Sequence, residues 1–237
     1  MKKFLIALLF APLTVLASEN VHLDKAPVNL QDYASLQRGA RTFTNYCLTC
    51  HSANYMRYSR LQDIGLTKDQ IKHNLMFASD AIGSRMTIAM RPDDAKKWFG
   101  MAPPDLTVEA RSRTPDWIYT YLRSFYRDDK RPTGWNNTVF PNVAMPDVLY
   151  TLQGQQVLKD AANGGNADQP ELVLAVPGKM SAAEYNATVG DLVNYLAWMG
   201  EPGKIKRMEL GVMVLLFLGV FFILAYYLKK EFWKDIH

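Results

Sequence analysis

The chain has 237 residues, which is enough for one domain with a substantial core and leaves little room for a second. Its formal net charge is only +4, and no basic run is interleaved with aromatic residues, so the composition argues against a nucleic-acid-binding protein. The chain contains only two cysteines, which excludes a disulfide framework and a zinc site with four cysteine ligands.

The first residues have the pattern of a secretory signal peptide. Two lysines precede the apolar stretch 4–16, and small residues occupy the positions of a cleavage site. We therefore expect residues 1–17 to be removed and the exported protein to begin at Ser18. The alternative is an uncleaved membrane anchor, but Pro12 and the short apolar length argue against it.

A helical pattern begins at Tyr33, after an extended arm over 19–32. Apolar side chains then recur at helical spacing, namely Leu36, Ala40, Phe43 and Cys47. Gly39 lies inside this helix, where glycine costs about 1 kcal/mol relative to alanine. We therefore expect another backbone to come close at Gly39.

The helix leads into a C-x-x-C-H motif, Cys47-Leu48-Thr49-Cys50-His51. This motif is the attachment signature of c-type haem, in which two thiols form thioether links to the porphyrin and the histidine becomes the proximal iron ligand. The motif thus assigns Cys47 and Cys50 to covalent attachment and His51 to the iron. A redox-active C-x-x-C is the alternative, but that motif follows a strand rather than a helix.

Short elements are expected between the motif and the middle of the chain. The segment 52–61 is rich in tyrosine and arginine, and we expect it to wrap the haem edge. Thr67 and Gln70 have the spacing of a capping box, which predicts a short helix. Pro92 opens another short helix that ends near Phe99.

Prolines and a cap predict the next two segments. Pro103 and Pro104 preclude a helix and predict a stiff extended wall over 100–106. Thr114 as N-cap and Pro115 at the first helical position then start a helix. The expected apolar face of this helix carries Ile118, Leu122 and Phe125.

The following segment, 133–165, is expected to be mostly irregular because prolines and glycines interrupt it. Ser181 and Glu184 form a second capping box, which predicts a helix with apolar residues from Tyr185 to Met199. This helix is the last one expected before the C-terminal apolar stretch.

From Met208 to Leu228 the only charged residue is Glu209, and this stretch is long enough to cross a bilayer core of about 30 Å. We therefore expect a haem domain over 18–207, a transmembrane helix over 208–228 and a tail over 229–237. Lysine and arginine counts on the two sides are tied, so they do not orient the span. The signal peptide places the haem domain in the periplasm and the tail in the cytoplasm, with one pass through the inner membrane.

The second axial ligand of the iron is expected to be a methionine, because a thioether favours the ferrous state. Met101 and Met145 stand out among the 11 methionines, since both lie in segments stiffened by proline. Spacing alone does not separate these two residues. The remaining histidines are weaker candidates, namely His22, His73 and His237.

Several further features occur in a specific order along the chain. They are Leu36-Gln37-Arg38-Gly39-Ala40 before the C-x-x-C-H motif, Tyr58, Pro103-Pro104-Asp105-Leu106-Thr107, Arg111, Phe140-Pro141 before Met145, and Tyr195-Leu196-Ala197-Trp198 with Glu201-Pro202 before the span. In this order they closely resemble the cytochrome c1 family over nearly the whole mature chain.

The resemblance implies a mainly α fold, a class I cytochrome c-like haem domain with long irregular insertions, plus one C-terminal transmembrane helix. It implies that the first and last helices of the domain cross, with Gly39 and Tyr195 as partners. It also implies that Met145 is the axial ligand, that Arg111 binds a haem propionate, and that the pocket wall is formed by Pro103 and Pro104.

The resemblance further implies one covalently bound haem c in a quinol:cytochrome c oxidoreductase, the cytochrome bc1 complex. The chain would be an electron-carrying subunit rather than an enzyme on its own. Its partners would be cytochrome b, a Rieske iron–sulfur protein as electron donor and a cytochrome c as acceptor. Mitochondrial relatives carry an acidic stretch where 64–91 here is mixed in charge, which leaves the acceptor open.

Two other functions remain open from the sequence. The first is a membrane-anchored c-type cytochrome that serves another dehydrogenase or oxidase. The second is a haem peroxidase with an open sixth position, which would bind cyanide or carbon monoxide readily.

Overall fold

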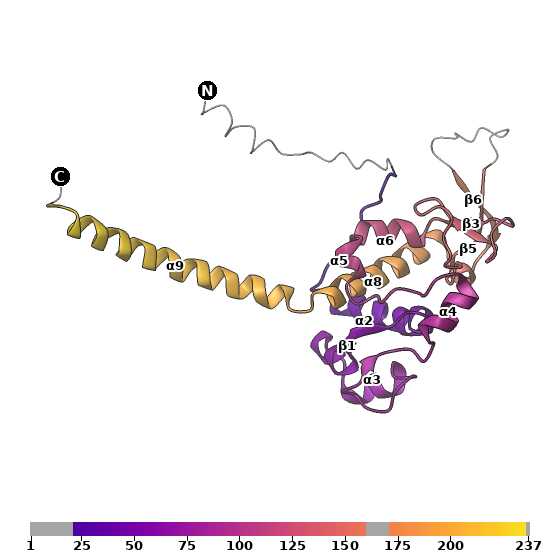
Figure 1. Ribbon diagram of the computed structural model, residues 1–237, viewed down its shortest axis with the longest axis horizontal. Helices are drawn as coiled ribbons and strands as arrows, with labels where there is room; N and C mark the ends of the chain where they lie inside the picture. Colours follow the sequence, from indigo (N-terminus) through magenta and orange to yellow (C-terminus); the bar gives the residue numbers. More distant parts are fainter. Residues whose placement is uncertain (1–20, 160–170, 236–237) are drawn as a thin grey trace, which may run out of the picture.

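The structure is a computed structural model that describes residues 21–159 and 171–235. The expected signal peptide, 1–17, and His237 lie outside the described residues. Figure 1 shows a mainly helical domain from which one long helix, α9 (Lys204–Phe232), projects into open space. The expected mainly α fold with one long C-terminal helix is confirmed.

The described elements follow the chain in a regular order. The helical ones are α2 (Tyr33–Thr42), η1 (Phe43–Cys47), η2 (Tyr58–Ile64), α3 (Lys68–Asn74), α4 (Pro92–Phe99), α5 (Glu109–Ser112), α6 (Pro115–Leu122), α7 (Tyr150–Gln153), α8 (Ala182–Gly200) and α9. The strands form three antiparallel pairs, β1 (Ala53–Arg57) with β2 (Arg85–Met86), β3 (Phe125–Arg127) with β4 (Trp135–Asn137), and β5 (Gly154–Leu158) with β6 (Leu172–Pro177).

The core of the domain is built on the crossing of α2 and α8, which Figure 1 shows at its centre. A Cβ atom added at Gly39 of α2 would lie 2.1 Å from the carbonyl oxygen of Asp191 in α8 and 2.6 Å from Cβ of Tyr195. Any larger side chain would therefore separate the two helices. Beside the contact, Arg38 binds the Asp191 carboxylate through two hydrogen bonds of 2.6 and 3.0 Å. The close approach predicted at Gly39 is confirmed.

The extended arm before α2 lies along the domain rather than away from it. The fully buried Asn194 of α8 accepts from the backbone N–H of Asn29 at 3.0 Å and donates to its carbonyl at 2.8 Å. Nearer the N-terminus, the backbone N–H of Ala26 donates to the Asp116 carboxylate at 2.9 Å. These bonds tie the arm to both α8 and α6.

Both predicted capping boxes are present. The Thr67 hydroxyl accepts from the Gln70 backbone N–H, and the Gln70 side chain accepts from the Thr67 N–H, at the start of α3. Ser181 and Glu184 make the same reciprocal pair at the start of α8. Local hydrogen bonding at the N-termini thus fixed these helix starts.

One sequence expectation about the middle of the chain was incomplete and one was wrong. The described part of the segment 133–165, residues 133–159, is mostly irregular as expected, but it also contains β4, α7 and β5. The helix that begins at Pro115 ends at Leu122, and Phe125 belongs to β3, which pairs with β4. Side-chain amides and non-local strand pairing, which local periodicity does not register, stabilise this region.

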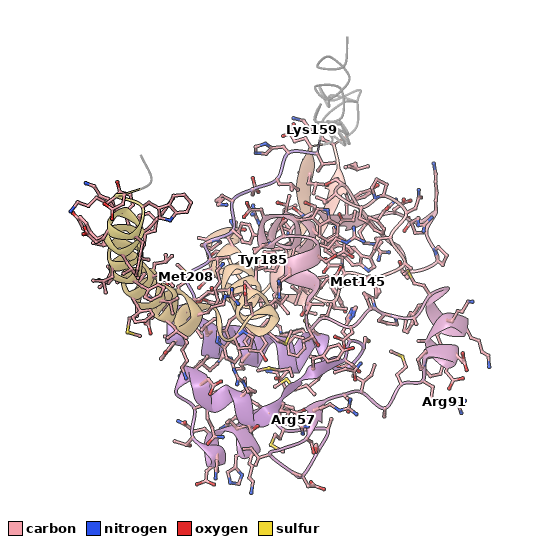
Figure 2. The ribbon with its side chains drawn as sticks, turned by 60° about the vertical axis from the view of Figure 1, so that its left-hand side comes forward. Arg57, Arg91, Met145, Lys159, Tyr185 and Met208 are labelled. Atoms are coloured by element: carbon pink, nitrogen blue, oxygen red, sulfur yellow. The ribbon has the colours of Figure 1, made fainter. Side chains whose placement is uncertain are left out.

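The C-terminal helix α9 is long and apolar enough to cross a membrane. None of its residues is buried against the rest of the described chain. Figure 2 shows Met208, near its start, at one side of the domain and well apart from Met145. The helix is therefore a separate rod with an exposed apolar surface, as expected of an anchor in lipid or against a partner.

Candidate haem-binding cavity

An apolar cavity lies beside the C-x-x-C-H motif. Its walls come from the motif, the 99–106 segment, α6, the 140–148 loop and α8, so segments far apart in sequence meet there. The lining residues that the sequence had singled out are Cys47, Cys50, His51, Met101, Pro103, Pro104 and Met145. These predicted residues, with Arg111 as the exception, are therefore brought together around one space.

The motif forms a tight turn at the end of the first helix. α2 widens into one π-helical turn, η1, which the Leu48 N–H closes by donating to the Phe43 carbonyl at 3.0 Å. The N–H groups of Cys50 and His51 then both donate to the Cys47 carbonyl, at 3.1 and 2.9 Å. This turn brings both thiols and the imidazole to the same cavity.

The imidazole of His51 is oriented by the proline wall. Its Nδ1 lies 2.8 Å from the carbonyl oxygen of Pro104, which accepts a hydrogen bond and so fixes the proton on Nδ1. Burial lowers the pKa of His51, although the Pro104 bond opposes this shift. The ring is therefore neutral near pH 7 and Nε2 keeps its lone pair, which is the form that ligates iron.

The wall itself is fastened to the chain that follows the motif. The Leu106 N–H donates to the Ser52 carbonyl at 2.9 Å. The Asp105 carboxylate accepts from the N–H groups of Asn54 at 2.7 Å and Thr107 at 2.9 Å. The position of Pro104, and with it the orientation of His51, is thus held by several hydrogen bonds.

Both candidate methionines line the cavity, in different environments. Met101 is 51% exposed, on the segment that precedes the proline wall. Met145 is packed against the hydrophobic core, and its Sδ accepts a hydrogen bond from the Tyr121 hydroxyl at 3.4 Å. Met145 is therefore the more firmly held of the two sulfurs.

Two asparagines shape the loop that carries Met145. The Oδ1 of Asn137 accepts from the N–H groups of Val139 and Phe140, at 2.9 and 3.1 Å. The Oδ1 of Asn136 accepts from the Asn142 N–H at 2.8 Å, where Asn142 has a left-handed φ of 63°. These side chains replace regular backbone hydrogen bonds and give the loop a defined course.

Three cavity-lining residues, one just before α6 and two on it, were not predicted from the sequence. The Arg113 guanidinium, just before the helix, lies 4.8 Å from the ring centroid of Trp117, and Trp117 stacks on Tyr121 at 4.8 Å. All three line the cavity. Their i, i+4 spacing could have indicated a common face directed at the cavity. The sequence pattern instead predicted an apolar face with Ile118 and Leu122, which also line the cavity.

The structure does not place Arg111 at the cavity. Its side chain is exposed and packs near Gly200 at the end of α8, where a Cβ atom would lie 3.2 Å from the Arg111 Cγ. The arginine that lines the cavity is Arg113, two residues later. Arg111 and Arg113 are two residues apart on the helical turn of α5 and its C-cap, so their side chains point in different directions.

The expectation for 52–61 was also wrong. This segment forms β1 and the start of η2, and none of its residues lines the cavity. Met56, Tyr58 and Leu61 are instead buried in the core. Aromatic and apolar side chains that resembled a cofactor wall thus serve ordinary packing.

The environment of the cysteines disfavours a redox-active dithiol. Burial, with a smaller contribution from Cys50, raises the pKa of the Cys47 thiol to about 12. A redox-active C-x-x-C requires a depressed pKa, because the thiolate is the reacting species. Two partly buried thiols that line the cavity, an imidazole with a free Nε2, a thioether and apolar walls instead fit a covalently attached haem.

Comparisons with known proteins agree with this chemistry. A model of the cytochrome c1 family matches residues 24–99 and 86–236. The cytochrome c1 of Allochromatium vinosum is 50% identical over 100% of both chains. A Nitrosomonas europaea protein named ammonia monooxygenase gamma subunit is also 50% identical, over 100% of this chain and 98% of its own.

Among solved structures, a chain of a hyperthermophilic respiratory complex III aligns over 100% of this chain and 98% of its own. Its identity is 14% and its TM-score is 0.44, which is too distant to support a conclusion. The family assignment rests on the family model and on the full-length relatives. This chain belongs to the cytochrome c1 family.

Proposed function

We propose that Cys47 and Cys50 hold haem c through thioether links, and that His51 and Met145 are its axial ligands. Members of the cytochrome c1 family carry one covalently bound haem c and are electron-transfer subunits of the cytochrome bc1 complex, and so is this chain. When bound, haem c supplies reversible one-electron chemistry. The observation that carries the proposal is the meeting of all four side chains at one apolar cavity.

Each part of the cavity has a distinct role. The Pro104 carbonyl holds the His51 ring in the tautomer that ligates iron. The apolar walls exclude water and so favour the less charged, ferrous form. Arg113 takes the propionate role that the sequence gave to Arg111, because a guanidinium on the cavity matches a carboxylate in geometry and charge.

The specific partners follow from this role. We propose that the Rieske iron–sulfur protein supplies the electron, that a cytochrome c accepts it, and that α9 lies beside cytochrome b. Among the described residues, α9 is the one helix long and apolar enough to cross a membrane, and we propose that it anchors the chain. We propose that the span covers 208–228, that the haem domain, 18–207, lies in the periplasm, and that 229–237 lies in the cytoplasm. The chain is then the carrier subunit, and quinol oxidation belongs to the whole complex.

Purification of the tagged chain in mild detergent tests membership in the complex. We expect haem b, an iron–sulfur signal and quinol:cytochrome c reductase activity to elute with haem c. A Cys47→Ser and Cys50→Ser double variant should lose the haem stain on a denaturing gel together with the reductase activity. Recovery of the chain alone, or with a monooxygenase such as the one named in the Nitrosomonas relative, would contradict the proposed partners.

The assignment of the distal ligand has its own test. Met145→Leu should abolish the far-red sulfur-to-iron charge-transfer band of the ferric protein, whereas Met101→Leu should retain it. The Met145 variant should also bind cyanide readily, because its sixth position is open. Loss of the band in the Met101 variant alone would show that the assignment is reversed.

A further inference from the structure

Inside the cavity, one hydrogen bond ends on the sulfur of Met145 itself. The hydroxyl of Tyr121 is the donor, 3.4 Å from Sδ. Tyr121 is only 9% exposed, so water has little access to compete for its hydroxyl, and Met145 is partly buried against the core. This residue lies on α6, far from both the C-x-x-C-H motif and the methionine loop in sequence.

The surrounding side chains fix the direction of this hydroxyl. The Tyr121 ring stacks on Trp117 with centroids 4.8 Å apart and an interplanar angle of 12°, and it meets the edge of Phe125 at 5.0 Å. Trp117 lies one helical turn before Tyr121 on α6, whereas Phe125 approaches from β3. The phenol therefore has little freedom to turn away from Met145.

The backbone of the donor is tied to the loop of the acceptor. The buried Asn137 side chain donates from Nδ2 to the Tyr121 carbonyl at 2.8 Å. Its Oδ1 accepts from the N–H groups of Val139 and Phe140, which begin the loop that carries Met145. One asparagine thus sets the position of both partners in the hydrogen bond.

A thioether sulfur has two lone pairs. A single donor occupies one lone pair and leaves the other for iron, so the hydrogen bond is compatible with ligation. A donor also withdraws electron density from sulfur, which weakens the bond to ferric iron more than the bond to ferrous iron. Hydrogen bonds to ligand atoms are an established means of adjusting a metal's reduction potential.

We propose that Tyr121 is a positioning residue that weakens the donor strength of the Met145 sulfur and thereby raises the reduction potential of the haem. The inference rests on the proposed assignment of Met145 as the distal ligand.

The variant Tyr121→Phe tests this role, because it keeps the stacked ring and removes only the hydroxyl. At a fixed ambient potential we expect the ferrous-to-ferric ratio of the full chain in detergent to fall by about two- to tenfold, the range of one hydrogen bond. The far-red charge-transfer band should persist but shift. Cyanide should displace the sulfur of the ferric form less readily, by a similar factor.

Tyr119→Phe is the matched control on the same helix. Tyr119 does not line the cavity, and its ring lies 4.3 Å from the Arg123 guanidinium. Its hydroxyl can therefore be removed without touching Met145. We expect the potential, the band and the cyanide affinity of this variant to match those of the unchanged chain.

A second measurement does not depend on a folded Tyr121→Phe protein. Replacing tyrosine with 3-fluorotyrosine throughout the chain makes each phenol a stronger donor. The potential should then rise in the unchanged sequence and in the Tyr119→Phe background. No rise in either protein would overturn the inference.

Failure of the inference is distinguishable from failure of the ligand assignment. If Tyr121→Phe and Tyr119→Phe have equal potentials, bands and cyanide affinities, Tyr121 does not act on the ligand, although Met145 remains the ligand. If Met145→Leu retains the far-red band, Met145 is not the ligand, and the role proposed for Tyr121 is overturned with it.

Discussion

The Pro104 carbonyl and the His51 ring show how single atoms set the chemistry of the cavity. One hydrogen bond of 2.8 Å fixes the tautomer of the imidazole, and burial lowers its pKa so that the ligating nitrogen stays unprotonated. At the other candidate ligand, the Tyr121 hydroxyl meets the Met145 sulfur. Each of the two proposed axial residues therefore has one polar partner within an otherwise apolar wall.

The two neighbouring arginines give a prediction at this scale. Arg113 lines the cavity with 44% of its side chain exposed, whereas Arg111 lies outside it. Arg113→Gln should lower the reduction potential, because a nearby cation favours the ferrous form. The effect should stay below about 1 kcal/mol, since solvent screens a half-exposed charge.

Arg111→Gln is the matched control, and redox titration of both variants in mild detergent is the measurement. We expect the Arg111 variant to keep the potential of the unchanged chain. A fall in the Arg111 variant with none in the Arg113 variant would restore the assignment made from sequence.

Among the contacts between helices and strands, the close packing of α2 against α8 at Gly39 gives a prediction about the stability of the domain. Gly39→Ala gains about 1 kcal/mol of helix propensity. The added Cβ atom, however, would meet a backbone oxygen at 2.1 Å, and overpacking of this kind typically costs about 1–3 kcal/mol or more. We expect the clash to prevail and the variant to unfold roughly 4–8 °C below the unchanged chain.

Gly83→Ala is the matched control for this change, because a Cβ atom at Gly83 would meet no atom within 4 Å. Its unfolding temperature, followed by loss of the haem absorbance in detergent, should stay within about 2 °C of the original. Equal temperatures for the two alanine variants would mean that the helices do not cross at Gly39.

Local sequence features predicted the helices well and the strand pairs poorly. The capping residues Thr67 and Ser181 act within one turn, so their helix starts were legible. β5 pairs with β6, which lies beyond residue 170, and its Gln155 and Gln156 give no apolar alternation. The partner of such a strand is set by tertiary contacts rather than by its own pattern.

The residues of the candidate site also fall into those that local sequence predicts and those that tertiary contacts determine. The C-x-x-C-H motif specifies its own three residues, and Pro103 and Pro104 specify a stiff wall. Arg113 was not predicted because the family resemblance assigned the propionate to Arg111, and the sequence alone does not show which of two arginines at i and i+2 faces the cavity. Tyr121 was not predicted because its partner, Met145, lies in a loop fixed by asparagine side chains.

The whole molecule joins a self-contained domain to an exposed apolar helix. None of the α9 residues is buried, and the core residues lie within the rest of the described chain. A chain that stops at Arg207 should therefore be exported, take up haem and remain in the soluble periplasmic fraction. Fractionation with a haem stain is the measurement, and recovery only as aggregate would show that the domain needs α9 or a partner to fold.

A quinol pulse tests most directly whether this chain carries single electrons from quinol oxidation to a cytochrome c. In the purified complex, the pulse should reduce haem c by one electron per chain. Oxidised cytochrome c, added next, should reoxidise it. A haem c that stays oxidised after the pulse, although dithionite reduces it, would contradict this role.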